Sequence, residues 1–153
     1  MREILFKAKR TDNGKWVEGY YIYHIKRTPC VFGDSVKPED EQHVIMQDGF
    51  SDWNMPRDTV HYDIDPSTLC QYTGLTDKNG RKIWENDILR EYADTDSLGN
   101  DLYYFYQVFW DNINSEYGVK NDVESMGLSC VSTNWAEVIG NVFDNPELLE
   151  KAR

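Results

Sequence analysis

This chain of 153 residues contains short apolar stretches with a period of two, separated by sequences typical of tight turns. This pattern limits the folds that the chain can adopt more than any other feature. Ile4, Phe6 and Ala8 occupy alternate positions, and an Asp-Asn-Gly sequence follows at 12–14. A period of two is typical of a strand with one face toward a core. The Asn-Gly step favours the positive φ angles of a tight hairpin. We therefore predict a first strand here and a returning strand over 16–23.

The second half of the chain shows the same kind of pattern. Another Asn-Gly turn, at 77–80, separates predicted strands at 69–72 and 81–84. Aromatic and β-branched residues favour strands. Their density predicts two more, at 102–110 and 137–143.

Helical signals are confined to two short segments. Pro146 fits the first position of a helix, with Asp144 or Asn145 as its cap, and Glu and Leu residues follow. The sequence at 38–42, a proline followed by acidic residues, predicts one further short helix. Several short strands with so little helix favour a mainly β protein, as a small antiparallel barrel or a rolled sheet.

The length suits one compact domain or two small ones that share a core. Residues 26–58 mix Pro, Gly and acidic residues without clear periodicity, and they separate the first hairpin from the strands that follow. We predict an N-terminal β-hairpin region with an irregular acidic segment over 1–58. The second predicted domain covers 59–153 and ends in the short helix.

The charge is strongly negative and unevenly distributed. The chain has 16 Lys and Arg against 27 Asp and Glu, a formal net charge of −11. Binding to a nucleic-acid backbone relies mainly on Lys and Arg, so nucleic acid and anionic membranes are not expected partners. Residues 1–33 alone are basic, with seven basic and three acidic side chains. This contrast predicts either pairing within the fold or a partner-binding surface.

The expected location is the cytoplasm. The opening MREILFKAKR lacks the apolar region of a secretory signal, and no stretch approaches the roughly 18 apolar residues of a membrane span. Cys30, Cys70 and Cys130 lie far apart, with no Cys-x-x-Cys pair. They are predicted to be separate thiols, mostly buried, in a reducing compartment.

The common catalytic motifs are missing from the sequence. It has no phosphate-binding loop, no dinucleotide-binding glycine pattern, no His-Glu-x-x-His and no Gly-x-Ser-x-Gly. We therefore expect no enzyme activity and assign no catalytic, cofactor-binding or metal-binding residue.

One set of residues nevertheless allows a metal-dependent enzyme as an alternative. His61, Asp63 and Asp65 alternate along a predicted strand, so their side chains share one face. Imidazole and carboxylate ligands suit Mn²⁺ or Fe²⁺. The opposing prediction is a solvated outer face, because residues at this spacing are spread along a strand.

Aromatic residues make up 14% of the chain, and the densest run, Tyr103 to Tyr106, resembles a base-stacking platform. Its flanks are acidic rather than basic, which favours a core and subunit contact. Tyr and Trp are common in protein interfaces. Together with Trp84, Trp110 and Trp135, the run predicts a surface for self-association, and hence a homo-oligomer.

Three segments resemble the YopX family of phage and prophage proteins. They are YTGLTDKNG at 72–80 with IWENDIL at 83–89, WAEVIGNVFDNPELL at 135–149, and the N-terminal strand pair that includes WVEG at 16–19. Where the family has a glycine in Tyr-Glu-Gly-Asp-Ile-Val, this chain has Asn86. Asn is the non-glycine residue best suited to a left-handed backbone, so the same turn is expected.

The resemblance implies an SH3-like small barrel in the C-terminal part and an origin in a phage, prophage or other mobile element. It implies no catalytic residues. The shared residues are expected to be turn formers (Gly74, Asn79, Gly80, Asn86, Gly140) and core residues (Ile83, Ile88, Val138, Ile139).

Three hypotheses about function follow. The first is a non-enzymatic module that self-assembles or binds a host or phage protein, whose identity stays open. The second is an acidic decoy that imitates DNA and occupies a host nucleic-acid-binding protein. The third is the metal-dependent enzyme that uses His61, Asp63 and Asp65.

Overall fold

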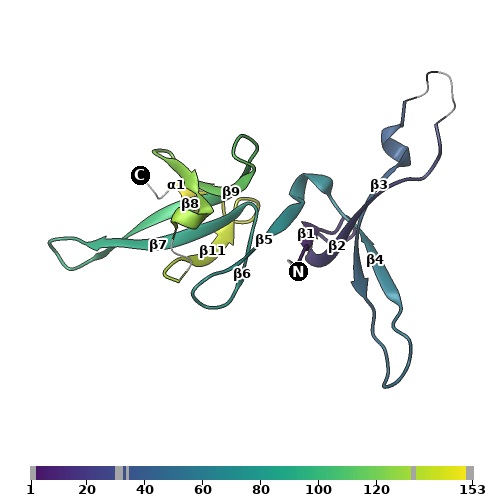
Figure 1. Cartoon of the computed structure of the whole chain (residues 1–153), viewed down its shortest axis with the longest axis horizontal. Coiled ribbons are helices and arrows are strands. Elements are labelled where there is room, and N and C mark those ends of the chain that lie inside the picture. Colours follow the sequence, from purple (N-terminus) through teal and green to yellow (C-terminus); the bar gives the residue numbers. More distant parts are fainter. Residues whose placement is uncertain (1–2, 30–32, 34, 132–133, 151–153) are drawn as a thin grey trace. The chain divides into compact units, whose positions relative to one another are not determined.

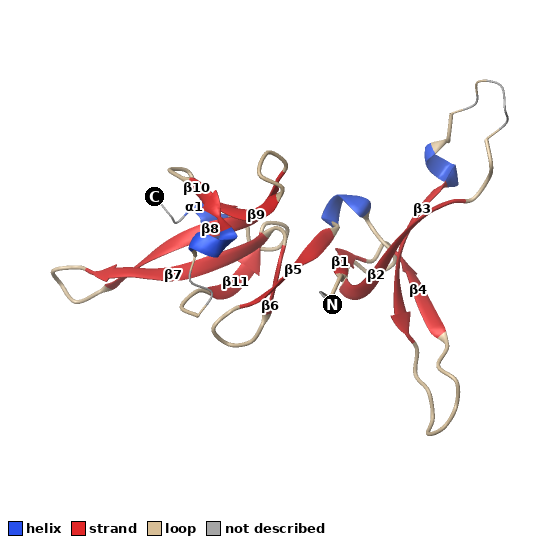
Figure 2. Ribbon diagram, viewed as in Figure 1, coloured by secondary structure: helices blue, strands red, loops and turns tan. Residues whose placement is uncertain are grey.

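The computed structural model describes residues 3–29, 33, 35–131 and 134–150, and these form mainly antiparallel strands (Figure 1). Figure 2 shows how little of the described chain is helical. Contacts divide the chain into two compact units at the step from Gln71 to Tyr72. We call residues 3–71 the N-terminal unit and residues 72–150 the C-terminal unit.

The N-terminal unit is an antiparallel sheet in the order β4-β3-β2-β1-β5. β2 is shared between two partners: its first residues pair with β1, and from Tyr20 onward it pairs with β3. The elements are β1 (Phe6–Lys9), β2 (Trp16–Ile25), the 3-10 helix η1 (Pro38–Asp40), β3 (Glu41–Asp48), β4 (Thr59–Asp63), the 3-10 helix η2 (Pro66–Thr68) and the start of β5 (Cys70–Thr76). Their side chains enclose a core of Ala8, Val17, Ile45 and Ile64.

The C-terminal unit contains a second antiparallel sheet, in the order β10-β9-β8-β7-β11. The end of β5 forms a hairpin with β6. The elements are β6 (Lys82–Trp84), β7 (Asp87–Thr95), β8 (Asp101–Asp111), β9 (Glu116–Lys120), β10 (Ser125–Gly127), the 3-10 helix η3 (Leu128–Cys130), β11 (Glu137–Asn141) and α1 (Glu147–Glu150). The core residues are Ile83, Leu89, Tyr106, Val108, Val119, Leu128, Val131, Ala136 and Val138.

The mainly β class is confirmed, and so are the two Asn-Gly hairpins and the short C-terminal helix. Asn86 has a φ of 65°, the left-handed turn expected of it. No closed barrel is found among the described strands, so the SH3-like barrel stays a prediction.

Other expectations fail for identifiable reasons. The segment predicted to be irregular contains β3, whose consecutive buried residues Val44 and Ile45 hide the period of two. Ile4 precedes β1 and is exposed, although it was expected to face the core. Cys70 is buried and Cys130 is exposed, and neither forms a disulfide with another described residue, while Cys30 lies outside the described residues.

Gly80 provides a direct test of the β5–β6 turn. Its φ is +79°, and a Cβ built there meets no atom within 4 Å, so a substitution adds backbone strain without a clash. We expect Gly80→Val to lower the free energy of unfolding by about 1–3 kcal/mol. Gly80→Asn is the control and should be nearly neutral, since Asn tolerates this conformation. Thermal unfolding of both variants checks the turn, and an unchanged melting temperature for Gly80→Val would contradict it.

Candidate functional site

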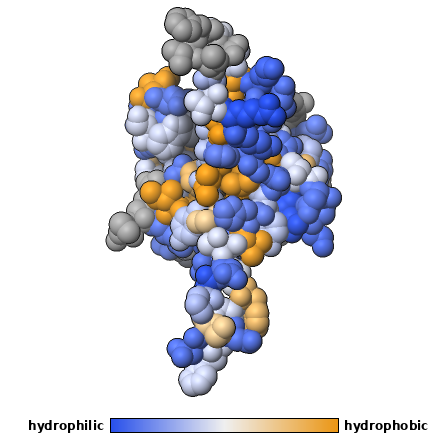
Figure 3. All heavy atoms as spheres, turned by 90° about the vertical axis from the view of Figure 1, so that its right-hand side faces the viewer, coloured by the Kyte–Doolittle hydropathy of each residue, from blue (hydrophilic) through white to orange (hydrophobic). Residues whose placement is uncertain are grey.

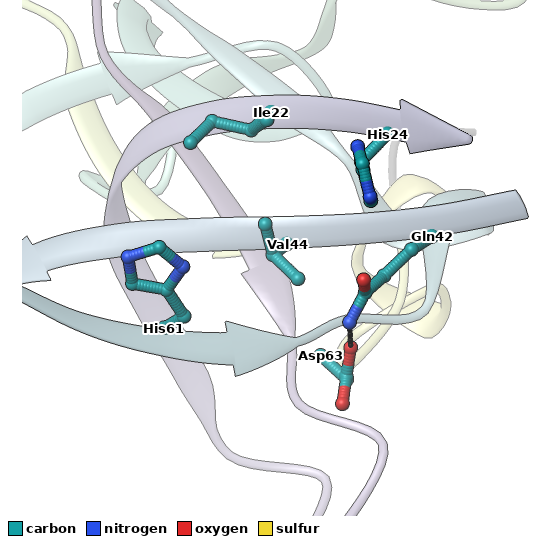
Figure 4. Close-up of a pocket in the computed structure, with 6 residues that line it drawn as sticks. All are labelled: Ile22, His24, Gln42, Val44, His61 and Asp63. Carbon is teal, nitrogen blue, oxygen red and sulfur yellow. Dashed lines mark hydrogen bonds between the residues drawn. The ribbon is translucent and has the colours of Figure 1, made fainter. Parts of the chain in front are cut away.

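An open pocket of about 410 Å³ lies on the sheet face of the N-terminal unit opposite its core. Figure 4 shows its lining, two residues each from β2, β3 and β4: Ile22, His24, Gln42, Val44, His61 and Asp63. The Gln42 side-chain amide donates to the Asp63 carboxylate over 2.8 Å. On the side of the molecule turned to the viewer in Figure 3, hydrophobic residues gather near the middle, among hydrophilic ones.

The predicted metal set is only partly assembled here. His61 and Asp63 line the pocket, but Asp65 does not. Its carboxylate instead accepts hydrogen bonds from the Ser67 amide and hydroxyl, which cap η2 and lower the pKa of Asp65. Within the described residues, no group of three or more His, Cys, Asp or Glu side chains could hold a metal ion. The convergence of all three residues, which the sequence allowed only as an alternative, is therefore not found among the described residues.

Sequence reasoning missed that His24 lines the same pocket as His61, from its other end. The two histidines lie on β2 and β4, which are joined through β3, and β3 itself was not recognised. The alternation of Ile22 and His24 along β2 was the available signal, but it does not reveal which strand pairs beside it.

The β7–β8 hairpin of the C-terminal unit is the second candidate site. β11 pairs with β7 only from Asp87 to Arg90, and β9 pairs with β8 only from Gln107 to Asp111. Beyond these residues the hairpin continues as two strands alone, and Figure 1 shows it extending past its neighbours. We call residues 91–106 the ribbon.

Tyrosines occupy both faces of the ribbon. Tyr92 and Tyr103 are cross-strand partners with ring centroids 6.1 Å apart, and the Arg90 guanidinium lies 4.7 Å from the Tyr103 ring centroid. On the other face, the Tyr104 and Tyr106 rings are also 6.1 Å apart. Tyr104 remains 51% exposed and Tyr92 50%, whereas Tyr106 enters the core. Aromatic side chains of this kind favour protein contact.

The ribbon is acidic as well as aromatic. It contains Glu91, Asp94, Asp96 and Asp101 and no Lys or Arg. The Asp96 carboxylate stabilises the β7–β8 turn by accepting hydrogen bonds from the Leu98 and Asn100 amides. At the inner end, the Tyr106 hydroxyl donates to the Glu124 carboxylate over 3.1 Å, and burial is the main cause that raises the pKa of Tyr106.

The structure buries some of the aromatic residues that were predicted to form one surface and exposes the others. Trp84 is buried against Tyr72 and belongs to the interior. Trp110 and Trp135 are exposed, as are Tyr103 and Tyr104. The structure brings Tyr103 and Tyr104 onto one ribbon with Tyr92, which the sequence had not linked to them.

The loop between β3 and β4 is a third exposed apolar feature. Phe50, Trp53 and Met55 all point outward there, and Trp53 is 97% exposed. The loop forms the lower projection in Figure 3. Its base is closed by the Gly49 amide, which donates to the Asp58 carbonyl.

Two buried aspartates in the motifs at 72–89 stabilise turns. The Asp77 carboxylate accepts from the amides of Asn79, Arg81 and Val138 at 2.9–3.0 Å, which joins the β5–β6 turn to β11. Burial alone would raise the pKa of Asp77, but these three donors more than offset it and lower that pKa. Asp87 accepts from the Trp84 amide. These buried charges therefore stabilise the fold.

Comparison with solved structures finds a similar fold in protein EF1440 from Enterococcus faecalis. The match covers 97% of this chain and 99% of that one, with a TM-score of 0.55 and 23% sequence identity. No curated protein matches the chain. No helix in the described part of the chain is long and apolar enough to cross a membrane.

The family model for the YopX protein matches residues 5–150, which include both candidate sites and the motif aspartates. The match spans nearly the whole chain, and this protein belongs to the YopX family.

Proposed function

We propose that this chain is a phage- or prophage-encoded accessory protein that acts as a non-enzymatic protein-binding module in the host cytoplasm, with the ribbon as its contact surface. The observation that carries the proposal is the exposure of tyrosines on both faces of a two-stranded extension. Tyr and Trp supply large contact areas at low entropic cost and are enriched among residues that dominate binding energy.

The pocket on β2, β3 and β4 gives less support to the enzyme alternative. His61 and Asp63 are both exposed to solvent. Catalytic acids and bases more often lie in partly buried clefts beside a specific charged partner. The proposal therefore rests on surface recognition and assigns no catalytic, cofactor or metal role.

Site-specific cross-linking tests the binding module. A photo-reactive phenylalanine analogue placed at Tyr104 is expected to form adducts with a discrete partner protein in host cells, whereas the same analogue at Ile113, an exposed residue outside the ribbon, is not. Leu102→Ser/Tyr104→Ser should remove capture of that partner, with Ile4→Ser/Ile113→Ser as the matched exposed control. Equal capture by both double variants would contradict the ribbon as the contact surface.

The acidic decoy makes a different prediction in the same experiment. Its partner would be a nucleic-acid-binding protein held mainly by charge, so duplex DNA and high salt should both release it. A partner held by the tyrosines should resist competition by DNA.

Self-association is part of the proposal, through exposed Phe50 and Trp53 in the β3–β4 loop. Light scattering of the purified protein is expected to give a mass above 18.0 kDa that falls toward the monomer in Trp53→Ser. A strict monomer at high concentration would count against this part alone. Membership of the YopX family also supports an SH3-like small barrel in the C-terminal part, which an experimental structure would test.

A further inference from the structure

We propose that the outer edge of β8, over Asp101–Tyr106, takes up one extended segment of a partner protein that carries basic residues at both ends and apolar residues between. The proposal rests on the ribbon being the contact surface and adds the binding mode and the chemistry of the partner. Addition of a strand to an open sheet edge is a common mode of peptide recognition, in which main-chain hydrogen bonds supply affinity and side chains supply specificity.

The strand pairing identifies the edge. One edge of β8 pairs with β7 throughout the ribbon. The opposite edge pairs with β9 only from Gln107 onward, and no described strand pairs with it over Asp101–Tyr106. The free stretch is six residues long, about 17 Å between its first and last Cα atoms at the usual rise of a strand. The main-chain groups on that side have no partner strand among the described residues.

The edge of β7 is a weaker candidate. The β7–β8 register shifts between Tyr92 and Asp94, which indicates a bulge at Ala93. Bulges interrupt the regular spacing of main-chain donors and acceptors and are one way in which proteins protect a free edge. On β8, each residue over Asp101–Tyr106 is paired with one residue of β7 and none is skipped. The β8 edge is therefore the more regular of the two.

Charge determines the chemistry of the partner. The open stretch lies between two carboxylates: Asp101 is its first residue, and Glu124 reaches its last residue through the Tyr106 hydroxyl. Neither of these carboxylates forms an ion pair in the described structure, and Glu91 on β7 adds a third negative charge near Tyr106. A segment with Lys or Arg at each end would neutralise both ends of the edge.

The tyrosines fit the same partner. Leu102 and Tyr104 are exposed on one face of the open stretch and Tyr103 on the other, so apolar side chains of an added strand would find contacts on both faces. The ribbon already accommodates a cation on a tyrosine, since Arg90 lies over Tyr103. Arg and Lys side chains interact favourably with aromatic faces in this way.

A second copy of this chain is the less suitable occupant. Antiparallel pairing of two β8 edges about a two-fold axis would place Asp101 of each copy at the end where the other copy has Tyr106, near Glu91 and Glu124, with no basic ribbon residue to compensate. Like charges in close contact oppose association. The partner is therefore a different protein with a basic extended segment.

Peptide binding to the full chain tests the proposal. The probe is a fluorescent peptide of alternating Val and Thr with two lysines at each end, and the control peptide has glutamates in place of lysines. We expect the lysine peptide to bind at least about tenfold more tightly in fluorescence anisotropy, and its affinity to fall several-fold when salt is raised. Equal binding of the two peptides, or no binding of the lysine peptide, would overturn the proposal.

Two protein variants separate the edge from general charge attraction. Asp101→Asn/Glu124→Gln is expected to weaken lysine-peptide binding about tenfold, whereas Asp52→Asn/Asp58→Asn, which removes the same charge from the exposed β3–β4 loop, should leave it unchanged. Equal weakening by both variants would mean non-specific attraction and would contradict the site.

Hydrogen exchange identifies the binding mode. The lysine peptide is expected to slow exchange of amides within 101–106 and to leave those of 91–95 unaffected. If these amides are already protected without peptide, and the protection increases with protein concentration, a second copy of the chain binds at this edge instead. If peptide binding fails while ribbon cross-linking at Tyr104 succeeds, the basic-segment proposal is wrong and the protein-binding function stands.

Discussion

Asp77→Ala is expected to lower the free energy of unfolding of the C-terminal unit by about 3–5 kcal/mol. The Asp77 side chain is 6% exposed and accepts hydrogen bonds from three backbone amides. Each hydrogen bond to a charged group contributes about 1.5–3 kcal/mol, and the sum is reduced because water can enter the space left by the carboxylate. Chemical denaturation followed by circular dichroism measures the loss.

Asp77→Asn serves as the matched control and adds a dependence on pH. Asn keeps one acceptor oxygen, so its cost should be smaller than that of Ala. Because the pKa of Asp77 is lowered in the folded protein, its carboxylate stabilises the fold fully above the unfolded value, about 3.9. This stabilisation is lost as the pH falls through the lower folded value. The difference between the wild type and Asp77→Asn should therefore shrink on acidification, and a constant difference would contradict the charge-based explanation.

Gly19→Ala should have a comparable effect in the N-terminal unit, about 3 kcal/mol. A Cβ at Gly19 would lie 2.3 Å from the Met46 carbonyl oxygen and 2.9 Å from a methyl of Ile45. Gly19 is the residue at which β2 changes partner from β1 to β3, so β3 can move away only by disturbing the core around Ile45. Overpacking of this kind typically costs 1–3 kcal/mol and sometimes more.

Hydrogen exchange locates the effect of Gly19→Ala. Amides in β2 and β3 are expected to lose protection, while those in β7, β8 and β9 keep it, because the two sets belong to different compact units. Gly14→Asn, at a turn position with a φ of +68° and open space around it, is the control that should change little. Equal loss of protection in both units would show that they unfold together.

Turn chemistry explains why much of the fold was predictable. The Asn-Gly steps at 12–14 and 77–80 define hairpins through local backbone preference, which does not depend on distant residues. Asn86 was predictable for a similar reason, because Asn tolerates the left-handed conformation better than other non-glycine residues. β3 was missed because Val44 lines the pocket while Ile45 enters the core, so both faces of the strand carry buried apolar residues.

The candidate sites depended on contacts that no local pattern contains. The sequence placed His61 and Asp63 on one face of a strand, but the use of Asp65 as a cap for η2 became clear only from the structure. Similarly, the aromatic run at 103–106 was visible, whereas its exposure was not. Tyr104 and Tyr106 are two residues apart on the same face, yet one is exposed and the other is buried.

The sequence by itself determined the family, the mainly β class and the positions of the tight turns, because these follow from motifs and from local backbone preferences. Only the tertiary structure decided which aromatic residues are available to a partner. That outcome depends on where β9 and β11 stop pairing with β8 and β7, and strand pairing between distant segments is set by the packing of the whole sheet.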